Sequence, residues 1–480
     1  MLNQKNEPIP GASISVSEIN RSFSADVEGR FSVLLEQGKK YTFTVTAVGF
    51  QTKAVDEVEV KANEIDNTLT ILLDVVAKEG TEIIIRSTAR RENTSGLLSF
   101  QRNNTSLSSG LSADFIRRTP DKNTGEVLKR VSGASIQDNK FVIVRGLSDR
   151  YNQALINGAQ LPSSEPDKKA FSFDVIPSQL IDNIIINKTA TPDLTGEFAG
   201  GLVQINTKDI PTRNFLTIGA SLGFNTQSAF QDFVSNERGS TDYLGFDDRR
   251  SIPSSYPMKY GVYNTLPADE RRQISADFRD DVWGEQTSVA GPIQSYNLTW
   301  ANAVRSEKGG AFGSVIGITY RNSKLIYNAT KELFEKDGQQ AFFSYADQQN
   351  KYSTTVGALA NFAWTKRNHK IAFKNLFNQL YEDNYYRREG PNTENLQDVR
   401  LRSSVLNQRS LLSSQLEGTH TFWRKLKATW NLNYSYNSKE QPDLRVLTYG
   451  RSLGTNDPFS ANLRGNNTNR FFSNLTDHAA

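Results

Sequence analysis

Residues 214–224 of this 480-residue chain read NFLTIGASLGF, and this stretch decides which kind of fold the sequence encodes. Apolar Leu216, Ile218 and Leu222 alternate with small or polar residues such as Thr217. Because side chains on a β-strand point alternately to its two faces, this two-residue period predicts a strand with one apolar and one polar face. Such a strand separates two different solvents.

The same alternation recurs along the rest of the chain. Each alternating segment is about ten residues long, the length a tilted strand needs to cross membrane hydrocarbon. The connections alternate between short and long, which is typical of an outer-membrane barrel, whereas a soluble β-sandwich has no reason to sort its loops in this way. Residues 212–480 are therefore predicted to form the first strands of an antiparallel transmembrane β-barrel. The predicted strands span residues 215–224, 294–304, 311–320, 354–364, 370–380, 408–422 and 426–437, and the predicted long loops span residues 225–292, 321–353 and 381–406.

Residues 1–78 contain short strand-like segments separated by turn signals, which predicts a small antiparallel β-sandwich. The predicted strands lie in GASISVSEI, DVEGRFSVLL, YTFTVTAVGF and LTILL. This pattern resembles the carboxypeptidase-regulatory-like domain at the N-terminus of many Bacteroidetes outer-membrane receptors, an accessory fold without peptidase machinery. The residues that carry the resemblance are Pro10, Gly11, Gly29, Arg30, Phe31, Tyr41, Gly49 and Phe50.

Residues 79–211 change to a mixed α/β texture. Ser112 is placed to cap a short helix ADFIRR, residues 125–131 favour a second helical turn, and Pro177 suits the first position of a third, PSQLID. Apolar strands are expected between them, in FVIVRG, QALING, NIIINKT and GLVQINTK. These features predict a separate α/β domain.

Three motifs in this region occur in a recognisable order. They are FVIVRGLSDRYNQALINGAQLP at residues 141–162, FDVIPSQLIDNIIINKTA at residues 173–190 and GEFAGGLVQINTK at residues 196–208. Together they resemble the plug domain of TonB-dependent outer-membrane receptors; the alternative is a generic globular α/β domain. The resemblance implies a transporter in which a substrate binds the external loops and the outer face of the plug. The energy-coupling protein TonB then pulls from the periplasmic side and displaces the plug.

Several plug-motif residues are interpreted as structural. An Arg inside a plugged lumen usually pairs with carboxylates on the barrel wall, and Asn-Gly supplies the positive φ of a tight hairpin. Paired glycines before the last plug strand permit close approach of backbone. The residues given these roles are Arg145, Gly146, Asn157, Gly158, Gly200 and Gly201.

The segment TEIIIR at residues 81–86 lies directly ahead of the plug motifs. In the family that the chain resembles, a short apolar stretch here, the TonB box, pairs with TonB by strand addition, and a β-branched segment suits that role. The alternative is that the segment is simply the first strand of the plug, and the sequence leaves both interpretations open. The candidate TonB-box residues are Thr81, Glu82, Ile83, Ile84 and Ile85.

Catalytic, metal and nucleic-acid functions have little support. Residues 219–223 match the nucleophile pattern G-x-S-x-G, but they lie inside the alternating strand, so Ser221 is expected to face the lumen. His369, His420 and His478 stand far apart in the sequence, without zinc spacing, and the chain has no Cys. The net charge of +4 predicts no nucleic-acid partner. We expect no enzyme activity, no metal and no cofactor.

The predicted function is nutrient import through the cell outer membrane. The expected partners are TonB, outer-membrane lipid, a small-molecule, chelate or oligomeric nutrient, and a surface lipoprotein. The family's substrates include chelated iron, vitamin cofactors, glycans and peptides, and the aromatic and charged residues 381–395 suit a sugar or a chelate. The rival classes are a secreted or surface β-sandwich adhesin, which is soluble without detergent, and an envelope hydrolase, which lacks a recognisable catalytic set.

The chain is expected to be a fragment of a longer gene product. Its first residues show no signal peptide. Seven strands are predicted up to residue 437, whereas plugged outer-membrane barrels close with about 22.

Overall fold

The computed structural model divides into two compact units, Met1–Ile84 and Ile85–Ala480. Each unit is described by itself. The predicted domain boundaries at residues 78/79 and 211/212 stay predictions. The described residues are 1–3, 7–60, 68–74, 94–138, 140–161, 163, 170–192, 194–208, 211, 214–259, 261–306, 309–335, 338, 341–422, 426–463 and 468–479.

The first unit is built on a four-stranded antiparallel sheet. Its order is β3 (Arg21–Ser24), β2 (Ser13–Val16), β4 (Lys40–Thr46) and β5 (Lys53–Glu59). Alternate side chains of β2 and β4, including Ile14 and Phe43, are buried in one apolar core. A parallel pair of short strands, β1 (Leu2–Asn3) and β6 (Leu72–Leu73), adds buried Leu73 to that core.

One predicted strand of this unit is wrong. Residues 26–35, DVEGRFSVLL, form a turn followed by chain without regular structure, and no strand. The Asp26 carboxylate accepts hydrogen bonds from the backbone N–H groups of Glu28 and Arg30, at 2.9 and 2.8 Å. Such local side-chain bonds compete with pairing to a neighbouring strand, and Gly29 adopts φ +72° in the same turn.

The second unit begins with an α/β region of the predicted kind. Its five-stranded sheet is antiparallel except for the parallel pair β10–β13. The sheet order is β11 (Ala159–Gln160), β10 (Asn152–Ile156), β13 (Gly201–Thr207), β12 (Ile181–Asn187) and β7 (Ser108–Ser112). A two-stranded sheet, β8 (Ala134–Gln137) with β9 (Phe141–Val144), comes between β7 and β10 in the sequence.

Two of the three predicted helices form, the second of them ending at Leu128 and not at residue 131. Ser112 caps α2 (Ala113–Arg118) by accepting from Phe115 N at 3.4 Å, and Asn123 caps α3 (Thr124–Leu128). The third is a 3₁₀ turn, η5 (Ser178–Leu180), and the prediction that it continues through ID is wrong. Ile181 already begins β12, because the β-branched run that follows pairs with β13 on one side and β7 on the other. A further helix, α1 (Thr94–Asn103), precedes them.

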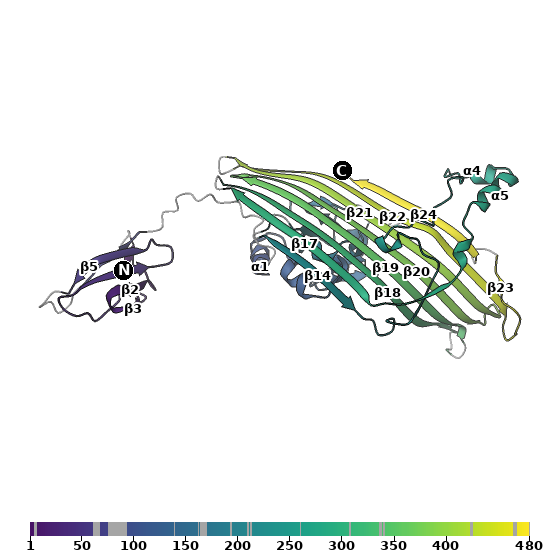
Figure 1. Ribbon diagram of the computed structural model, residues 1–480, viewed down its shortest axis with the longest axis horizontal. Coiled ribbons are helices and arrows are strands. Elements are labelled where there is room, and N and C mark those ends of the chain that lie inside the picture. The colour runs from purple at the N-terminus through teal and green to yellow at the C-terminus, as the bar shows by residue number, and fades with distance from the viewer. Residues whose placement is uncertain are drawn as a thin grey trace. The chain divides into compact units, whose positions relative to one another are not determined.

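The rest of the unit is one large antiparallel sheet (Figure 1). Neighbours in this sheet follow chain order up to β22, which then pairs with both β23 and β24. Among the described strands, β14 pairs only with β17, so the sheet is open at that edge. Its strands are β14 (Phe215–Gly223), β17 (Ile293–Ser306), β18 (Gly310–Phe334), β19 (Ala341–Lys366), β20 (His369–Asn392), β21 (Gln397–Phe422), β22 (Leu426–Ser452), β23 (Ser460–Ala461) and β24 (Thr468–Ala479).

Five of these strands are much longer than predicted. Strands β18 to β22 each contain 24 to 27 residues, so most of the predicted loops at residues 321–353 and 381–406 is strand. Backbone pairing continues past the apolar segments because the N–H and C=O groups hydrogen-bond whatever their side chains are. The expected alternation of short turns with long loops therefore fails at those two places.

The connection at residues 224–292 is long, as predicted. It carries a two-stranded ladder, β15 (Asp232–Ser235) with β16 (Gln286–Val289), and two helices, α4 (Val262–Thr265) and α5 (Ala268–Ala276). We call residues 224–292 the folded loop. No helix in the described part of the chain has the length and apolar character needed to cross a membrane.

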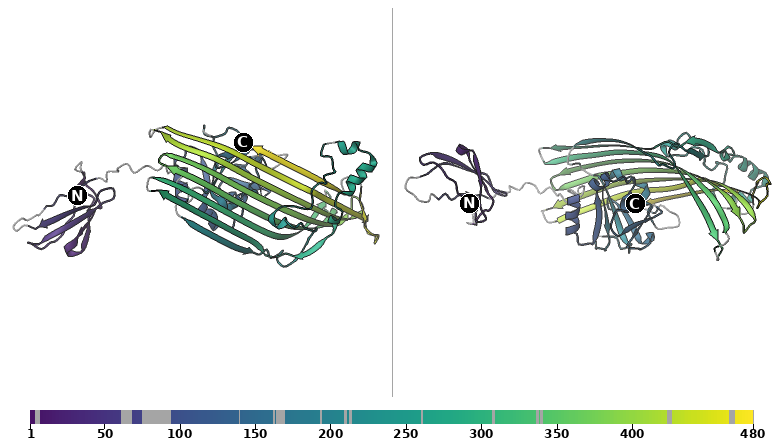
Figure 2. Two further views of the ribbon diagram at one scale, coloured as in Figure 1. Left: turned by 45° about the horizontal axis from the view of Figure 1, so that its top comes forward. Right: turned by 90° about the horizontal axis from the view of Figure 1, so that it is seen from below.

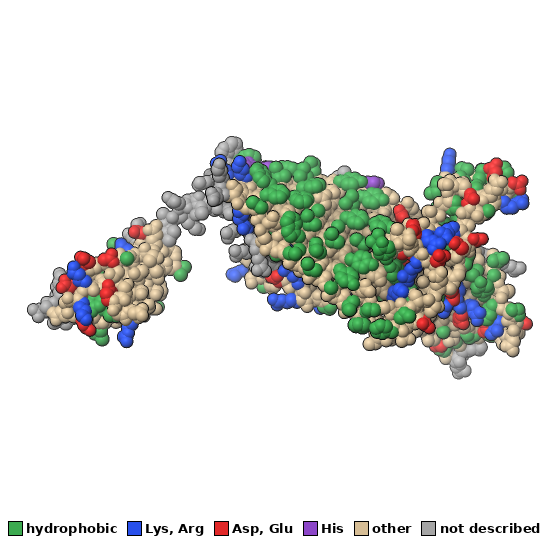
Figure 3. All heavy atoms as spheres, viewed as in Figure 1, with side chains coloured by type: hydrophobic (Ala, Val, Ile, Leu, Met, Phe, Trp, Pro, Cys, Tyr) green, Lys and Arg blue, Asp and Glu red, His purple; other side chains and the backbone are tan. Residues whose placement is uncertain are grey.

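The two faces of the large sheet differ. On one face, apolar side chains such as Ile218, Trp300 and Leu432 are exposed and gather in a band across the strands (Figure 3). On the other, Val315, Leu359 and further apolar side chains join one buried cluster with residues of the α/β region. Figure 2 shows that region lying against one side of the curved sheet.

Candidate functional site

A cavity of about 490 Å³ opens between the folded loop and strands β20 to β22. Its wall combines several arginines with a carboxylate and flat aromatic rings. We call it the arginine cavity. Its charged and aromatic lining residues are Trp283, Glu285, Tyr385, Arg400, Arg402, Arg445, Tyr449 and Phe459.

Strand geometry places the arginines together. Arg400 and Arg402 are two residues apart on β21, so they project from the same face. On β22, Arg445 and Tyr449 share one face in the same way, and Arg400 lies directly opposite Tyr449 in the register. Cross-strand neighbours on one face stand close enough to interact, so the ladder assembles a basic and aromatic wall.

The folded loop supplies the facing wall. Strands β15 and β16 pair Ser235 with Gln286, so Asn236 and Glu285 emerge together from the end of that ladder. A 3₁₀ turn, η7 (Asp281–Trp283), brings the indole of Trp283 to the same rim.

Glu285 is held by three partners. It accepts a hydrogen bond from Tyr385 Oη at 2.7 Å, pairs with Arg402 Nε at 3.0 Å, and bonds the guanidinium of Arg387. Burial acts to raise the pKa of Glu285, but these hydrogen bonds and cationic neighbours hold that pKa below its ordinary value. Glu285 therefore remains charged and ties the folded loop to β20 and β21.

Arg445 is the most buried cation of the cavity wall, with 2% of its side chain exposed. Its Nε lies 3.5 Å from Asp443 Oδ2, and its Nη1 donates to the carbonyl of Val282. Nε and Nη2 make no hydrogen bond. Burial lowers the pKa of Arg445 to about 10, so the group stays protonated at neutral pH without a full set of acceptors.

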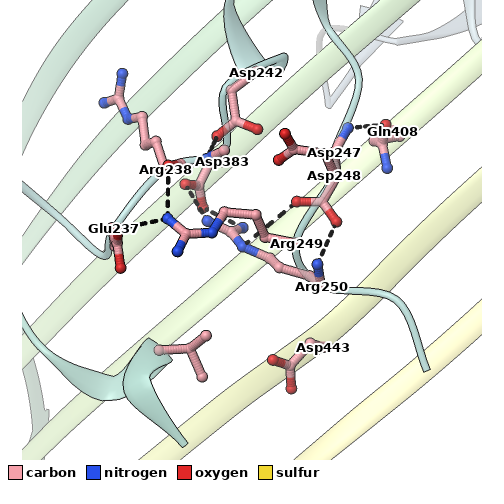
Figure 4. A network of polar contacts seen from close by, with 12 residues as sticks. Glu237, Arg238, Asp242, Asp247, Asp248, Arg249, Arg250, Asp383, Gln408 and Asp443 are labelled. Atoms are coloured by element: carbon pink, nitrogen blue, oxygen red, sulfur yellow. Dashed lines mark hydrogen bonds and ion pairs between the residues drawn. The ribbon is translucent and has the colours of Figure 1, made fainter. Parts of the chain in front are cut away.

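A buried polar network anchors the folded loop on the sheet (Figure 4). Arg250 from the loop reaches Asp383 of β20 with two hydrogen bonds, at 3.0 and 3.3 Å, and both side chains are buried. The backbone N–H of Asp247 donates to Gln408 of β21 at 3.0 Å. Burial raises the pKa of nearby Asp242 to about 6. The network fixes the loop wall of the cavity.

A second set of contacts joins the α/β region to the inner face of the sheet. Arg409 of β21 donates to Asp174 at 3.0 and 3.1 Å and to Ser172 at 3.1 Å, with 2% of its side chain exposed. Gln415 donates to the carbonyl of Asn157 at 3.0 Å, and Asn361 donates to Thr207 at 3.0 Å. These polar groups are buried but hydrogen-bonded.

Glycines on the sheet allow the α/β region to pack closely. A Cβ added at Gly317 would lie 2.9 Å from Leu180, and one at Gly357 would lie 2.7 Å from Pro177. Turn η5 therefore sits directly on strands β18 and β19, where any side chain would push it away.

The motif residues with predicted structural roles lie within the α/β region. Asn157 and Gly158 have φ values of 50° and 89° and form the tight turn between β10 and β11. A Cβ on Gly200 would meet Asn152, and one on Gly201 would meet Val144 at 2.9 Å. Both glycines therefore stand where the chain approaches a neighbour closely.

Arg145 departs from the expected pairing. Its guanidinium donates to the carbonyls of Ala199 and Gly200 at 2.9 to 3.2 Å, and within the described ranges it pairs with no carboxylate of the sheet. Arg145 and Gly146 both have positive φ, which turns the chain at the end of β9 and points the arginine at residues 199–200.

Three further predictions concern individual residues. Ser221 lies inside β14 opposite Ser295, as the alternating pattern predicts. His369 and His420, far apart in the sequence, are cross-strand partners with their Nδ1 atoms 3.0 Å apart. No metal-binding group of three or more His, Cys, Asp or Glu occurs within the described ranges. The candidate TonB-box residues Thr81 to Ile85 lie outside the described residues.

Sequence reasoning did not identify the arginine cavity. Residues 381–395 were predicted to lie in a long loop whose composition suits a sugar or a chelate, with a plain solvated loop as the alternative; they lie largely in β20 and contribute Tyr385 to the cavity. Arg400 and Arg402 fell in a predicted loop and Arg445 beyond the last predicted strand. The available signal was the spacing of two between Arg400 and Arg402, which places both on one face of a strand.

Two family models match the chain. Residues 1–85 match the CarboxypepD_reg-like domain, and residues 101–203 match the TonB-dependent Receptor Plug Domain. The chain therefore contains a carboxypeptidase-regulatory-like domain followed by a TonB-dependent receptor plug domain. We call the α/β region the plug from here on. A search of curated proteins found no match.

Solved structures of outer-membrane receptors also align with the chain, at low similarity. They include the outer membrane transporter YddB from Escherichia coli (TM-score 0.25, 9% identity, 76% of this chain and 58% of that chain). The siderophore receptor PirA from Acinetobacter baumannii has TM-score 0.26 and 10% identity, covering 78% and 75%. The alcaligin receptor FauA from Bordetella pertussis has TM-score 0.27 and 9% identity, covering 73% and 63%. The aligned chain thus spans less than two thirds of YddB and of FauA.

Proposed function

We propose that this chain is part of a TonB-dependent receptor of the outer membrane that binds a scarce nutrient and imports it into the periplasm. The observation that carries the proposal is the combination of a plug domain with a sheet whose far face is an exposed apolar band. An apolar band on period-two strands suits contact with lipid, and a plug on the opposite face suits a gated passage.

The contacts between plug and sheet support a mechanism of plug displacement. A force that pulls the plug away must break or loosen the polar contacts that hold it on the sheet. These contacts are the ion pair of Arg409 with Asp174 and the hydrogen bonds of Asn361 and Gln415. Segments that move under force have lower local stability than the element that holds them. Here the sheet supplies the continuous ladder and the plug supplies the movable part.

Energy coupling is assigned to residues 81–86, ahead of the plug. We infer that Ile83, Ile84 and Ile85 pair with the C-terminal domain of TonB by strand addition. The alternative, in which these residues form the first plug strand, predicts no TonB contact at this place.

The test compares Ile84→Pro with Thr88→Pro in the full chain. Proline removes a backbone donor and blocks strand pairing, so Ile84→Pro should weaken binding of the purified TonB C-terminal domain at least about tenfold in calorimetry. Thr88→Pro, outside the predicted box, should leave that binding unchanged. Equal binding by all three proteins would refute the assignment, and failure of Ile84→Pro to assemble would favour the plug-strand alternative.

The outer-membrane assignment has its own test. The chain should appear in the outer-membrane fraction and require detergent for extraction, because the apolar band otherwise faces water. A protein extracted quantitatively by salt alone would contradict the receptor and favour a surface adhesin.

A further inference from the structure

We propose that the arginine cavity binds a small ligand that carries an oxyanion, a carboxylate, phosphate or sulfate group, next to a ring that lies against the cavity's aromatic side chains. The inference rests on the proposed function, because it assigns the place and the chemistry by which the imported nutrient is first recognised.

The cavity wall carries more cations than its own carboxylates balance. Of the described lining residues, Glu285 alone is acidic, and it is already engaged by Tyr385, Arg387 and Arg402. Among the described residues, the lining groups and the partners of their ion pairs comprise five guanidinium groups and three carboxylates, an excess of two positive charges within this set. The set consists of Arg387, Arg400, Arg402, Arg445, Arg470, Glu285, Glu389 and Asp443.

Arg445 shows where that excess is least compensated. Both carboxylate oxygens of its partner Asp443 accept hydrogen bonds from Arg470, at 2.6 and 2.7 Å. Asp443 Oδ2 lies 3.5 Å from Arg445 Nε, and the two atoms form no hydrogen bond. A buried guanidinium with two nitrogens whose N–H groups lack acceptors is costly. Water screens such a charge poorly, so its field acts on whatever occupies the cavity, and an anion there is stabilised.

Arg400 is more exposed, with 41% of its side chain free, but one of its nitrogens also lacks an acceptor. Its Nε lies 3.1 Å from Glu389 Oε1 but forms no hydrogen bond, and the same Oε1 accepts from Arg402 at 2.5 Å. One carboxylate oxygen thus serves two arginines. A planar guanidinium is suited to bidentate binding of a carboxylate or phosphate, which would supply the missing acceptor.

The aromatic part of the wall argues for more than a bare ion. The Arg400 guanidinium lies 4.2 Å from the centre of the Phe459 ring, and the Arg445 guanidinium lies 5.7 Å from that of Trp283. Flat side chains beside cations offer a surface to an aromatic or sugar ring. The volume of about 490 Å³ falls in the range of small-molecule sites.

The first experiment needs no mutation. The full chain in detergent micelles is titrated with phenyl phosphate, benzoate and D-glucuronate, and with the neutral analogues benzyl alcohol and D-glucose, and the heat released is measured by calorimetry. We expect each effective anion to bind at least about tenfold more tightly than its neutral analogue. If phenyl phosphate or benzoate binds more tightly than glucuronate, the natural ligand is an aromatic acid or chelate. If glucuronate binds more tightly, the natural ligand is an acidic sugar. Equal binding of charged and neutral probes, or no binding of any probe at millimolar concentration, would overturn the proposal.

The second experiment places the site. Arg400→Gln should weaken the binding of the best anionic probe by about tenfold or more. Arg451→Gln is the matched control, because Arg451 also lies over Phe459, at 4.7 Å, and pairs with Asp398, but does not line the cavity. Wild-type affinity in Arg400→Gln, or equal losses in both variants, would contradict the assignment. If Arg400→Gln does not assemble, Arg400→Lys is used in its place. It keeps the charge without the planar fork and should bind the same probe more weakly than the wild type, with a smaller loss of affinity than the loss of about tenfold expected for Arg400→Gln.

Neither titration involves TonB or transport. A negative result would therefore remove the cavity as the ligand site and leave nutrient import standing, whereas loss of TonB binding would affect import and leave these titrations unchanged.

Discussion

The two faces of the large sheet reverse the usual distribution of side chains in a soluble protein, where apolar residues are buried and charged residues are exposed. The outer face exposes large apolar side chains, such as Leu432 with 65% of its surface free, and the inner face buries charged and polar ones, such as Arg409 and Asn361. Both sets alternate along the same strands. The comparison teaches that burial alone does not select apolar residues here. The exposed apolar face suits contact with lipid, whereas the inner face meets the plug through both an apolar cluster and buried polar groups.

The largest effect is expected on the inner face, from Arg409→Met. Removing the guanidinium leaves Asp174 as an uncompensated, largely buried carboxylate, which typically costs about 3–5 kcal/mol. Hydrogen exchange followed by mass spectrometry should show lost protection in β12 and β13. Arg451→Met, which breaks an ion pair closer to solvent, should cost less than about 1 kcal/mol. Equal protection in both variants would mean that Arg409 does not hold the plug.

The outer face is tested next, at adjacent positions of β22. Leu432→Arg should cost about 2–4 kcal/mol of unfolding free energy in lipid if the residue lies near the bilayer midplane. Asn431→Arg should cost far less, because its side chain is on the plug side, where Asn431 Nδ2 lies 3.9 Å from a Cβ position on Gly158. Equal losses in denaturant unfolding would show that the two faces are not distinct solvents.

The smallest expected effect concerns close packing on the inner face. Gly357→Ala introduces a methyl group 2.7 Å from Pro177 and 2.6 Å from Thr319, and overpacking of this kind costs about 1–3 kcal/mol. Gly291→Ala is the control, since nothing lies within 4 Å of its Cβ position. Gly357→Ala should therefore unfold at a lower temperature than Gly291→Ala. A Gly357→Ala protein as stable as Gly291→Ala would indicate that the plug rests more loosely on the sheet.

The plug was recognisable from the sequence because its signals are local. Caps such as Ser112, the Asn157–Gly158 turn and the β-branched run before Asn187 each determine their own few residues, and their order along the chain carries the resemblance. Local competition also explains why the strand predicted at residues 26–35 does not form, since the Asp26 side chain accepts hydrogen bonds from backbone N–H groups that would otherwise pair with a neighbouring strand. Whether residues 81–86 are the TonB box stays a prediction.

The sequence by itself determined the β class of the last half of the chain, the two-faced character of its strands and the presence of the plug, because period and turn chemistry act over a few residues. Only the tertiary structure decided how far β18 to β22 extend, since their polar segments carry no apolar face to mark them. It also decided which distant residues meet. Glu285 joins Arg402 across more than a hundred residues, and His369 joins His420, because strand register and the folding of one loop bring them together.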